Sequence, residues 1–292
     1  MPMPSSSPTT ERPFDMDYEK KVRSAIKLLQ SIPQDGPIEI SYSSGKDSDV
    51  ILELAKMAGI PFEAIYKNTT IDRPGSIQHA KEMGATIINP KKGMLELIEE
   101  MGWPSRWMRF CCKSLKEYKV YDRAVQGIRR SESAARAKRY HEPEVCRVYS
   151  KKEKARIYLP ILEWTDADVE RFIKERGLKC HPHYYDAEGK FHVERRVGCI
   201  GCPLASDYGR ADFKEYPKML KLWMRAHSIW LKNHPNTKSA KTFNSVYDAV
   251  YMKLFCKNMA EFNAAIAPTL FSDYQLDTKK YLEEYFGIDL TV

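Results

Sequence analysis

The segment Ser43-Ser44-Gly45-Lys46-Asp47-Ser48 has the residue types and the spacing to bind phosphate. It stands where an apolar strand pattern ending at Ser41-Tyr42 meets a helix start, and N–H groups at a helix N-terminus form an anion site. Gly45 lets the backbone approach phosphate oxygens closely, Lys46 adds a positive charge, and the serines add short hydroxyl donors. The segment is not a Walker A loop, because no glycine stands five positions before Gly45 and Asp47 occupies the Ser/Thr position. A Gly-Lys turn capped by Asp47 and Ser48 is the structural alternative, but the flanking strand and helix favour a phosphate loop.

Four of the seven cysteines form two close pairs. Cys111 is next to Cys112, and Cys199 and Cys202 form a C-x-x-C motif followed by Pro203. C-x-x-C by itself is compatible with zinc, redox chemistry or an iron–sulfur cluster. Adjacent cysteines are poor disulfide partners for each other and are unusual in zinc sites. The remaining three fit no motif, so we expect them to pack as small buried hydrophobes, with a sulfur-relaying thiol as the alternative: Cys146, Cys180 and Cys256.

A further candidate anion site is Gly127-Ile128-Arg129-Arg130-Ser131-Glu132-Ser133-Ala134-Ala135-Arg136. Arg129 leaves a predicted strand end, while Ser133 and Arg136 occupy the start of the next helix, so the three can converge on an anion. The alternative is a basic, solvated helix, because further Arg and Lys residues lie nearby.

Short strand patterns alternate with helical stretches from Pro37 onward and predict a parallel sheet covered on both faces. We expect strands at residues 38–42, 62–66, 86–88, 124–128 and 156–161, and helices at 47–58, 75–83 and 165–175. Asn68 and Thr69 follow the second strand, at the edge where such sheets bind ligands, and a polar turn is the alternative. After residue 203 the aromatic-rich stretches 216–233 and 242–257 predict a helical region whose aromatic side chains form a core. These patterns predict a Pro/Ser-rich disordered tail (1–16), a nucleotide-binding and cysteine domain (17–206) and a helical C-terminal region (207–292).

The composition is that of a globular protein, with a formal charge of +8 that favours nucleotide phosphates or nucleic acid as partners. No apolar run is long enough to cross a bilayer, so we expect no membrane span. The N-terminus lacks the order of a secretory signal, and seven cysteines without one indicate a reducing, cytoplasmic location. No sequence feature bears on oligomeric state.

Ser43–Ser48 resembles the Ser-Gly-Gly-Lys-Asp-Ser loop of the PP-loop superfamily, which includes ATP pyrophosphatases, thiolation enzymes and the phosphoadenosine phosphosulfate reductase family. In that superfamily the loop wraps the phosphates of an adenine nucleotide, and the reacting bond lies at the α-phosphate. The departure is Ser44, which replaces the first glycine. The resemblance extends to Asn68-Thr69, to the motif from Gly127 to Arg136 and to His181-Pro182-x-Tyr184, where His181 is either a ligand contact or a structural histidine. It implies a doubly wound, parallel five- to six-stranded α/β sheet with an added helical C-terminal region.

Cys-Cys followed at a distance by Cys-x-x-Cys-Pro, with Lys116 four residues after the second cysteine, is similar to the iron–sulfur members of this family. The resemblance implies a [4Fe–4S] cluster on Cys111, Cys112, Cys199 and Cys202, with zinc as the less favoured alternative. Sulfonucleotide reductases carry a nucleophilic cysteine in a C-terminal motif, which this chain lacks after Cys256.

That absence, together with the intact Gly-Lys-Asp-Ser, favours an ATP pyrophosphatase that activates a nucleic acid for sulfur transfer, as in DNA phosphorothioation. The resemblance implies that Ser44, Gly45, Lys46 and Ser48 hold the β- and γ-phosphates, and that Asp47 helps hold Mg²⁺. Arg129 and Arg136 would stabilise charge at the α-phosphate. It also implies DNA, or tRNA, as acceptor and a cysteine desulfurase as sulfur source. The alternatives are a sulfonucleotide reductase and a non-catalytic nucleotide- or nucleic-acid-binding subunit.

Overall fold

A computed structural model describes residues 13–267 and 276–292, which fall into two compact units. Unit 1 takes in the chain up to Tyr66, Gly75–Ile87 and Lys119–Val197, and unit 2 takes in Lys67–Pro74, Ile88–Tyr118 and Gly198–Val292. Residues 1–12 of the predicted tail lie outside the described residues, and a helix begins at Pro13, inside the predicted tail. The domain boundary at residue 206 stays a prediction, because the two units alternate along the chain.

A six-stranded sheet organises the α/β part of the chain, in the order β3-β2-β1-β4-β6-β5. β1 pairs in parallel with β2 and β4, and β4 pairs in parallel with β6. The predicted α/β sheet is confirmed, with one addition: β5 pairs antiparallel with β6 at the edge. The strands are β1 (Ile38–Tyr42), β2 (Glu63–Lys67), β3 (Thr86–Ile88), β4 (Arg123–Val125), β5 (Glu144–Val148) and β6 (Lys154–Tyr158).

The sheet order reverses at β1, because the chain first winds outward through β2 and β3 and then continues on the other side through β4 and β6. In such sheets ligands bind outside the carboxyl ends of the strands at this switch point. The segments that follow β1 and β4 are the predicted phosphate loop and the Gly127–Arg136 motif. The topology therefore brings two of the predicted anion-binding segments to one edge of unit 1.

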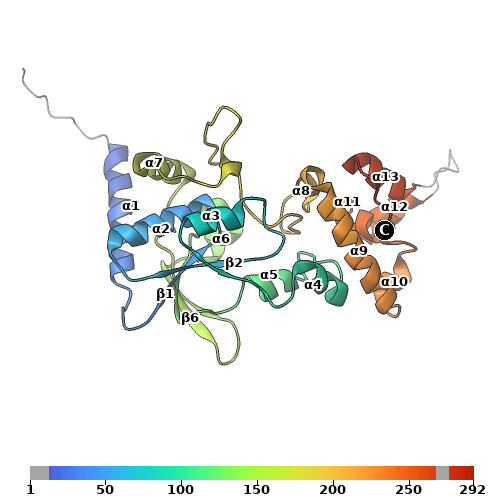
Figure 1. The fold of residues 1–292 in the computed structure, drawn as a ribbon, viewed down its shortest axis with the longest axis horizontal. Helices are drawn as coiled ribbons and strands as arrows, with labels where there is room; N and C mark the ends of the chain where they lie inside the picture. The colour runs from blue at the N-terminus through green and yellow to red at the C-terminus, as the bar shows by residue number, and fades with distance from the viewer. Residues whose placement is uncertain (1–12, 268–275) are drawn as a thin grey trace, which may run out of the picture. The chain divides into compact units, whose positions relative to one another are not determined.

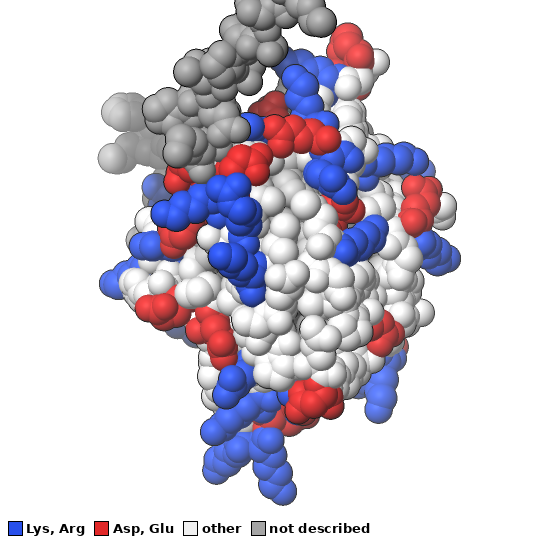
Figure 2. Space-filling view, turned by 90° about the vertical axis from the view of Figure 1, so that its left-hand side faces the viewer, with Lys and Arg blue, Asp and Glu red and all other residues white. Residues whose placement is uncertain are grey.

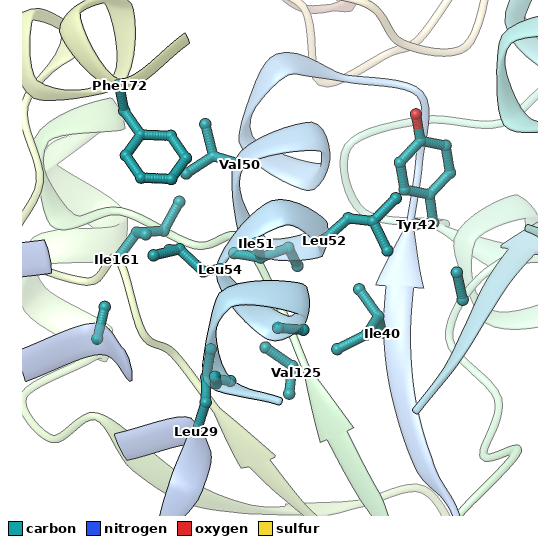
Figure 3. Packing of buried hydrophobic residues seen from close by; sticks show 14 of the residues in the cluster. Leu29, Ile40, Tyr42, Val50, Ile51, Leu52, Leu54, Val125, Ile161 and Phe172 are labelled. Atoms are coloured by element: carbon teal, nitrogen blue, oxygen red, sulfur yellow. The ribbon is translucent and has the colours of Figure 1, made fainter. Parts of the chain in front are cut away.

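Helices cover the sheet of unit 1 and are listed here: α1 (Pro13–Gln30), α2 (Lys46–Ala58), α3 (Ser76–Glu82), α6 (Ala134–Arg139), α7 (Asp166–Arg176) and the 3₁₀ turns Arg130–Glu132 and Pro182–Tyr184. α1 and α7 both pack against α2, which packs on β1 (Figure 1). Side chains of α2 such as Ile51 and Leu54 meet Ile40 of β1, Val125 of β4 and Leu29 of α1 in a fully buried core (Figure 3). β1 is almost wholly buried although it contains Glu39 and Ser41, and these two polar side chains hydrogen bond to each other at 2.7 Å.

Local sequence signals fix the ends of two helices that border the site. α2 ends at Gly59, whose φ of 66° is the left-handed conformation that glycine adopts without a steric penalty. α7 begins with a capping box: Asp168 N–H donates to Thr165 Oγ1 at 3.2 Å, and Thr165 N–H donates to Asp168 Oδ2 at 2.7 Å. Both boundaries follow the sequence prediction to within one residue.

Unit 2 contains the helices α4 (Met94–Met101), α5 (Phe110–Leu115), α8 (Arg210–Glu215), α9 (Pro217–Asn233), α10 (Lys238–Thr242), α11 (Val246–Phe255), α12 (Met259–Ile266) and α13 (Thr278–Phe286). Its core includes Trp103, Phe213 and Trp223, whose rings pack edge-on at 5.1–6.0 Å between centroids. α4 packs on α9 and α9 on α11. In the described parts of the chain, no helix has the length and apolar character needed to cross a bilayer.

Candidate functional site

The loop after β1 has a strained turn at Ser44. Its φ of 60° lies in the left-handed region, which a residue with a Cβ seldom adopts. Its side chain is fully buried, and its Oγ donates to the carbonyl oxygen of Ser76 at 2.7 Å. The Ser44 hydroxyl thus anchors to α3 a turn that glycine would form without strain.

Gly45 and Ser48 shape the first turn of α2. Gly45 is the residue before the helix, and its carbonyl oxygen accepts from both the N–H and the hydroxyl of Ser48, at 2.8 and 2.6 Å. Ser43 is exposed, and its Oγ lies 3.4 Å from that of Ser48. The exposed hydroxyl of Ser43 is free to turn toward a ligand, while Ser41 on β1 donates to Glu39 instead.

Lys46 is buried, with 5% of its surface exposed. Its backbone N–H donates to the hydroxyl of Tyr184 at 3.0 Å, and its Nζ lies 5.7 Å from the centre of the same ring. Burial raises the pKa of Tyr184, so the phenol is neutral at physiological pH. Among the described residues the ammonium of Lys46 is paired with Asp47 alone, at 3.5 Å, so it keeps donors available for an anion.

Asp47 is held by Arg129, whose guanidinium is almost completely buried. Arg129 Nε donates to Asp47 Oδ1 and its Nη2 to Asp166 Oδ1, both at 2.7 Å, and Nη1 donates to Ser131 at 3.1 Å. Gly127 packs directly on the backbone of Asp47, because an added Cβ would lie 2.8 Å from the Asp47 carbonyl oxygen. The structure thus pairs Arg129 with two carboxylates, and its predicted contact with a phosphate stays a prediction.

Arg136 on α6 lies in a group of cations beside Asp47. It pairs with Glu132, and Ser133 accepts from its backbone N–H at 3.2 Å, which makes Ser133 the helix cap. Burial lowers the pKa of Arg136, and the neighbouring Arg196 lowers it further. Arg196 is exposed and was not predicted from the sequence, which offers only its position beside Arg195 as a signal. Two guanidinium groups that lie close enough to repel each other are a feature of sites that bind anions.

A buried polar network lies behind the loop and centres on Asp49, one turn after Lys46. Asp49 is completely buried, accepts from the Tyr42 hydroxyl and lies 3.1 Å from His79 Nε2 on α3. His181 is also buried, accepts from the N–H of His183 at 3.1 Å and lies 3.4 Å from Ser76 Oγ. These contacts tie β1, α2 and α3 together, so His181 has the surroundings of a structural histidine.

The four predicted ligand cysteines all lie in unit 2 and are all half-buried. A hydrogen bond from the thiol of Cys111 lowers the pKa of Cys112, and Arg109 lowers it further. Together they outweigh burial, which raises this pKa, and bring it to about 6. Burial raises the pKa of Cys202, and Cys199 and Cys112 raise it further, so the two pairs lie close enough to interact.

Asp72 lies close to both Cys199 and Lys116 and so connects them. Cys199 Sγ lies 3.6 Å from Thr69 Oγ1 and 4.0 Å from Asp72 Oδ1, which is also 4.0 Å from Lys116 Nζ. Thr69 therefore contacts a cysteine within unit 2. Asn68 accepts from the N–H of Thr70 at 2.8 Å and closes a turn.

The fit of these residues to a metal depends on the kind of centre. Within residues 13–267 and 276–292, no three His, Cys, Asp or Glu side chains are grouped around one point as a mononuclear ion requires. A [4Fe–4S] cluster instead distributes its four thiolates over four iron atoms, so its sulfurs do not meet at one point. Four half-buried, mutually interacting thiols provide a donor set of the right kind for such a cluster.

The other cysteines differ in environment. Cys180 is buried behind the phosphate loop, and burial together with Asp49 raises the pKa of its thiol. Cys256, at the end of α11, is also buried, which raises its pKa to about 11. Cys146 is exposed on the edge strand β5. The first two are buried, packed thiols, as predicted, whereas the prediction of a buried thiol is wrong for Cys146.

Residues 37–205 match the family model described as the phosphoadenosine phosphosulfate reductase domain. The chain belongs to the phosphoadenosine phosphosulfate reductase family. It is 30% identical over 222 residues to an uncharacterized protein of Methanocaldococcus jannaschii, with 70% of this chain and 52% of that protein covered. It is 31% identical over 209 residues to sulfate adenylyltransferase subunit 2 of a Shewanella species, with 59% and 68% covered. The chain thus spans about half the length of the archaeal relative.

A solved structure of phosphoadenylyl-sulfate reductase from Candida auris aligns with 61% of this chain and 92% of its own length. The identity is 17% and the TM-score 0.41, a similarity too low to support an inference about function. The family assignment confirms the resemblance identified from the sequence, and with it a nucleotide-binding fold of the PP-loop type.

Proposed function

We propose that the chain is an ATP pyrophosphatase that splits ATP into AMP and pyrophosphate and so activates an acceptor for sulfur transfer. The observation that carries this proposal is the buried Lys46 at the N-terminus of α2, within an intact Gly-Lys-Asp-Ser loop at the switch point of the sheet. A helix N-terminus and a buried ammonium with available donors suit the β- and γ-phosphates of a nucleotide.

Charge near the α-phosphate would be stabilised by Arg136 and Arg196. An anion that binds between the two guanidinium groups would relieve their mutual repulsion. Because both groups are already in place, the site would need no rearrangement during the reaction. Arg129 would act indirectly, by holding Asp47. Since both oxygens of Asp47 already face cations, we propose that Mg²⁺ enters bound to the phosphates of ATP, as is usual for this ion.

The names of relatives support adenylyl chemistry. Sulfate adenylyltransferase subunit 2 is named for transfer of an adenylyl group to sulfate, an oxyanion. We propose that here the acceptor is a backbone phosphate of a nucleic acid, most simply DNA as in phosphorothioation, with a cysteine desulfurase as sulfur source. The formal charge of +8 agrees with a polyanionic acceptor. On the face drawn in Figure 2 the Lys and Arg side chains are spread among acidic ones, so overall charge does not locate the acceptor.

We further propose that Cys111, Cys112, Cys199 and Cys202 hold a [4Fe–4S] cluster. Such a cluster supplies iron-bound sulfur and one-electron chemistry when present. Iron and acid-labile sulfide in anaerobically purified protein, both lost in a variant with all four cysteines changed to serine, test this assignment. Zinc in place of iron would overturn it.

A sulfonucleotide reductase is less well supported, because a thiosulfonate mechanism requires an accessible thiolate. Cys180 and Cys256 are buried, and their pKa values are raised. In the described part of the chain, neither can serve as that nucleophile without a rearrangement of its surroundings.

Pyrophosphate release from ATP tests the proposal, with Lys46→Ala as the decisive variant. Loss of one preorganised charge contact to the phosphates should lower the rate by about 10²–10³-fold. Lys56→Ala is the matched control, because Lys56 lies exposed on the same helix. Sulfite release from a sulfonucleotide with a reductant, without pyrophosphate release from ATP, would overturn the proposal. Nucleotide binding without either reaction would indicate a non-catalytic subunit.

A further inference from the structure

Trp107 is the most exposed large hydrophobic side chain in the described parts of the chain, with 96% of its surface accessible. An indole ring is a large apolar surface that proteins normally bury at least in part. The exposed Met108, at 51%, and Leu204, at 46%, belong to the same unit. An isolated exposed apolar residue needs no explanation, but a fully exposed tryptophan on a well-held segment does.

The turn that carries Trp107 is fixed by several hydrogen bonds. Ser105 N–H donates to the Met108 carbonyl at 3.2 Å, and Met108 N–H donates to Ser105 Oγ at 3.0 Å, which places Trp107 at the tip. Arg106 donates to the carbonyl oxygens of Pro203 and Ala205 at 3.1 and 2.8 Å, and its guanidinium lies 4.6 Å from the centre of the Tyr208 ring.

Both ends of the segment are buried. Trp103 is 4% exposed and packs in the core of unit 2, and Phe110 at the start of α5 is 7% exposed. The indole of Trp107 is therefore held outward by a rigid base, which lowers the entropy lost when a ligand stacks on it.

The charges around Trp107 favour an anionic occupant. Between Glu100 and Glu117 the chain contains no acidic residue and four cations, which are Arg106, Arg109, Lys113 and Lys116. Lys113 is exposed on α5, and Arg109 is paired with Glu117 at 3.1 Å. An exposed aromatic ring with cations on both sides in the sequence is the combination that binds unpaired nucleobases, whose phosphates pair with the cations while the base stacks.

We propose that Trp107 is a stacking platform for an unpaired base of a nucleic acid, with the adjacent cations contacting its backbone phosphates. The turn lies directly before the Cys111–Cys112 pair, and Arg106 ties it to the segment after Cys202. The base would therefore bind beside the cysteine group of unit 2. This inference rests on the proposed nucleic-acid acceptor and names a residue that binds it.

Intrinsic fluorescence gives a direct test, because the other tryptophans are shielded. Trp103, Trp164 and Trp223 are at most 4% exposed, and Trp230 stacks between His227 and His234. A single strand of about 12 thymidines should quench the emission and protect it from acrylamide. An abasic deoxyribose-phosphate strand of the same length, which keeps the charge and lacks bases, should do neither.

Binding of a labelled thymidine strand is then compared among variants by fluorescence anisotropy. Trp107→Ala should weaken binding by roughly five- to 150-fold, the range measured for loss of one stacked base. Trp107→Phe should restore most of the affinity, and Leu222→Ala, an exposed apolar control on α9, should match the wild type. Equal binding of the abasic strand, or wild-type affinity in Trp107→Ala, would overturn the proposal. So would binding of an acidic protein at this turn without any binding of the thymidine strand.

Pyrophosphate release from ATP, measured on the same wild-type sample, separates this inference from the proposed function. Strand binding through Trp107 without ATP cleavage would overturn the proposed ATP pyrophosphatase activity and support the stacking role of Trp107. ATP cleavage without quenching by the thymidine strand would do the reverse.

Discussion

Gly127→Ala should damage the phosphate loop, although residue 127 lies 80 positions further along the chain than Asp47. Gly127 follows β4 and packs against the backbone of Asp47. A Cβ added there would lie 2.8 Å from the carbonyl oxygen, 3.0 Å from the carbonyl carbon and 3.1 Å from the Cβ of Asp47. All three atoms belong to the main chain or are bonded directly to it, so no flexible side chain can move aside.

The size of the effect follows from the missing space. The closest contact is about 0.6 Å shorter than ordinary van der Waals contact, so the loop or the β4 turn must shift by that amount. Overpacking of this kind costs about 1–3 kcal/mol, which corresponds to a fall of about 2–12 °C in melting temperature. Because a misplacement of about 1 Å can reduce catalysis about 10²-fold, we expect pyrophosphate release to fall by about 10- to 100-fold.

The assay combines thermal unfolding with pyrophosphate release at saturating ATP. Gly198→Ala is the matched control, because the same added methyl group meets nothing within 4 Å and the backbone there is not left-handed. A Gly127→Ala variant with wild-type stability and activity would show that the loop tolerates the shift, and that its observed geometry does not determine activity.

Two further predictions concern strain in the loop and the acid stability of unit 2. Ser44→Gly should leave the free energy of unfolding within about 1 kcal/mol of wild type, because relief of the left-handed strain offsets the lost hydrogen bond to Ser76. Ser44→Ala keeps the strain, loses the bond and should cost about 1–3 kcal/mol in urea unfolding; equal stability of the two variants would contradict this account. Burial lowers the pKa of His227 from 6.5 to about 4, so below pH 6.5 the unfolded chain binds a proton that the folded chain does not. Stability should therefore fall by about 3 kcal/mol as the pH drops from 6.5 to 4, and this part of the fall should be missing in His227→Phe. Identical pH profiles for the two proteins would refute the assignment.

The elements that the sequence predicts well are those whose signals are local. β1 and α2 are marked by an apolar run and by Gly59, and α7 by the Thr165 capping box. α1 was missed, although its buried residues Tyr18, Val22, Ala25 and Leu29 recur at the three- and four-residue spacing of a helix face.

Other features depend on partners that are distant in the sequence. β5 is an edge strand with alternating exposed and half-buried residues, and it is a strand because β6 pairs with it. The Asp49–His79 contact joins residues 30 apart, and the Arg129–Asp47 contact joins residues 82 apart. A single sequence shows that these side chains are polar, but it does not show which of them meet.

These contacts suggest a second reason for the spacing of residues in the motif that begins at Gly127. Two arginines at fixed spacing suggest two phosphate ligands, yet the guanidinium of Arg129 is buried between the carboxylates of Asp47 and Asp166. Gly127 meets the main chain of Asp47, and two residues later Arg129 binds its side chain. The spacing is therefore explained by a clamp on Asp47, since a glycine is required where the backbones touch and an arginine where the carboxylate must be held. The predicted phosphate contact of Arg136, which pairs with Glu132, stays a prediction. A buried arginine with two carboxylate partners holds Asp47 in one position, so this part of the loop is preorganised.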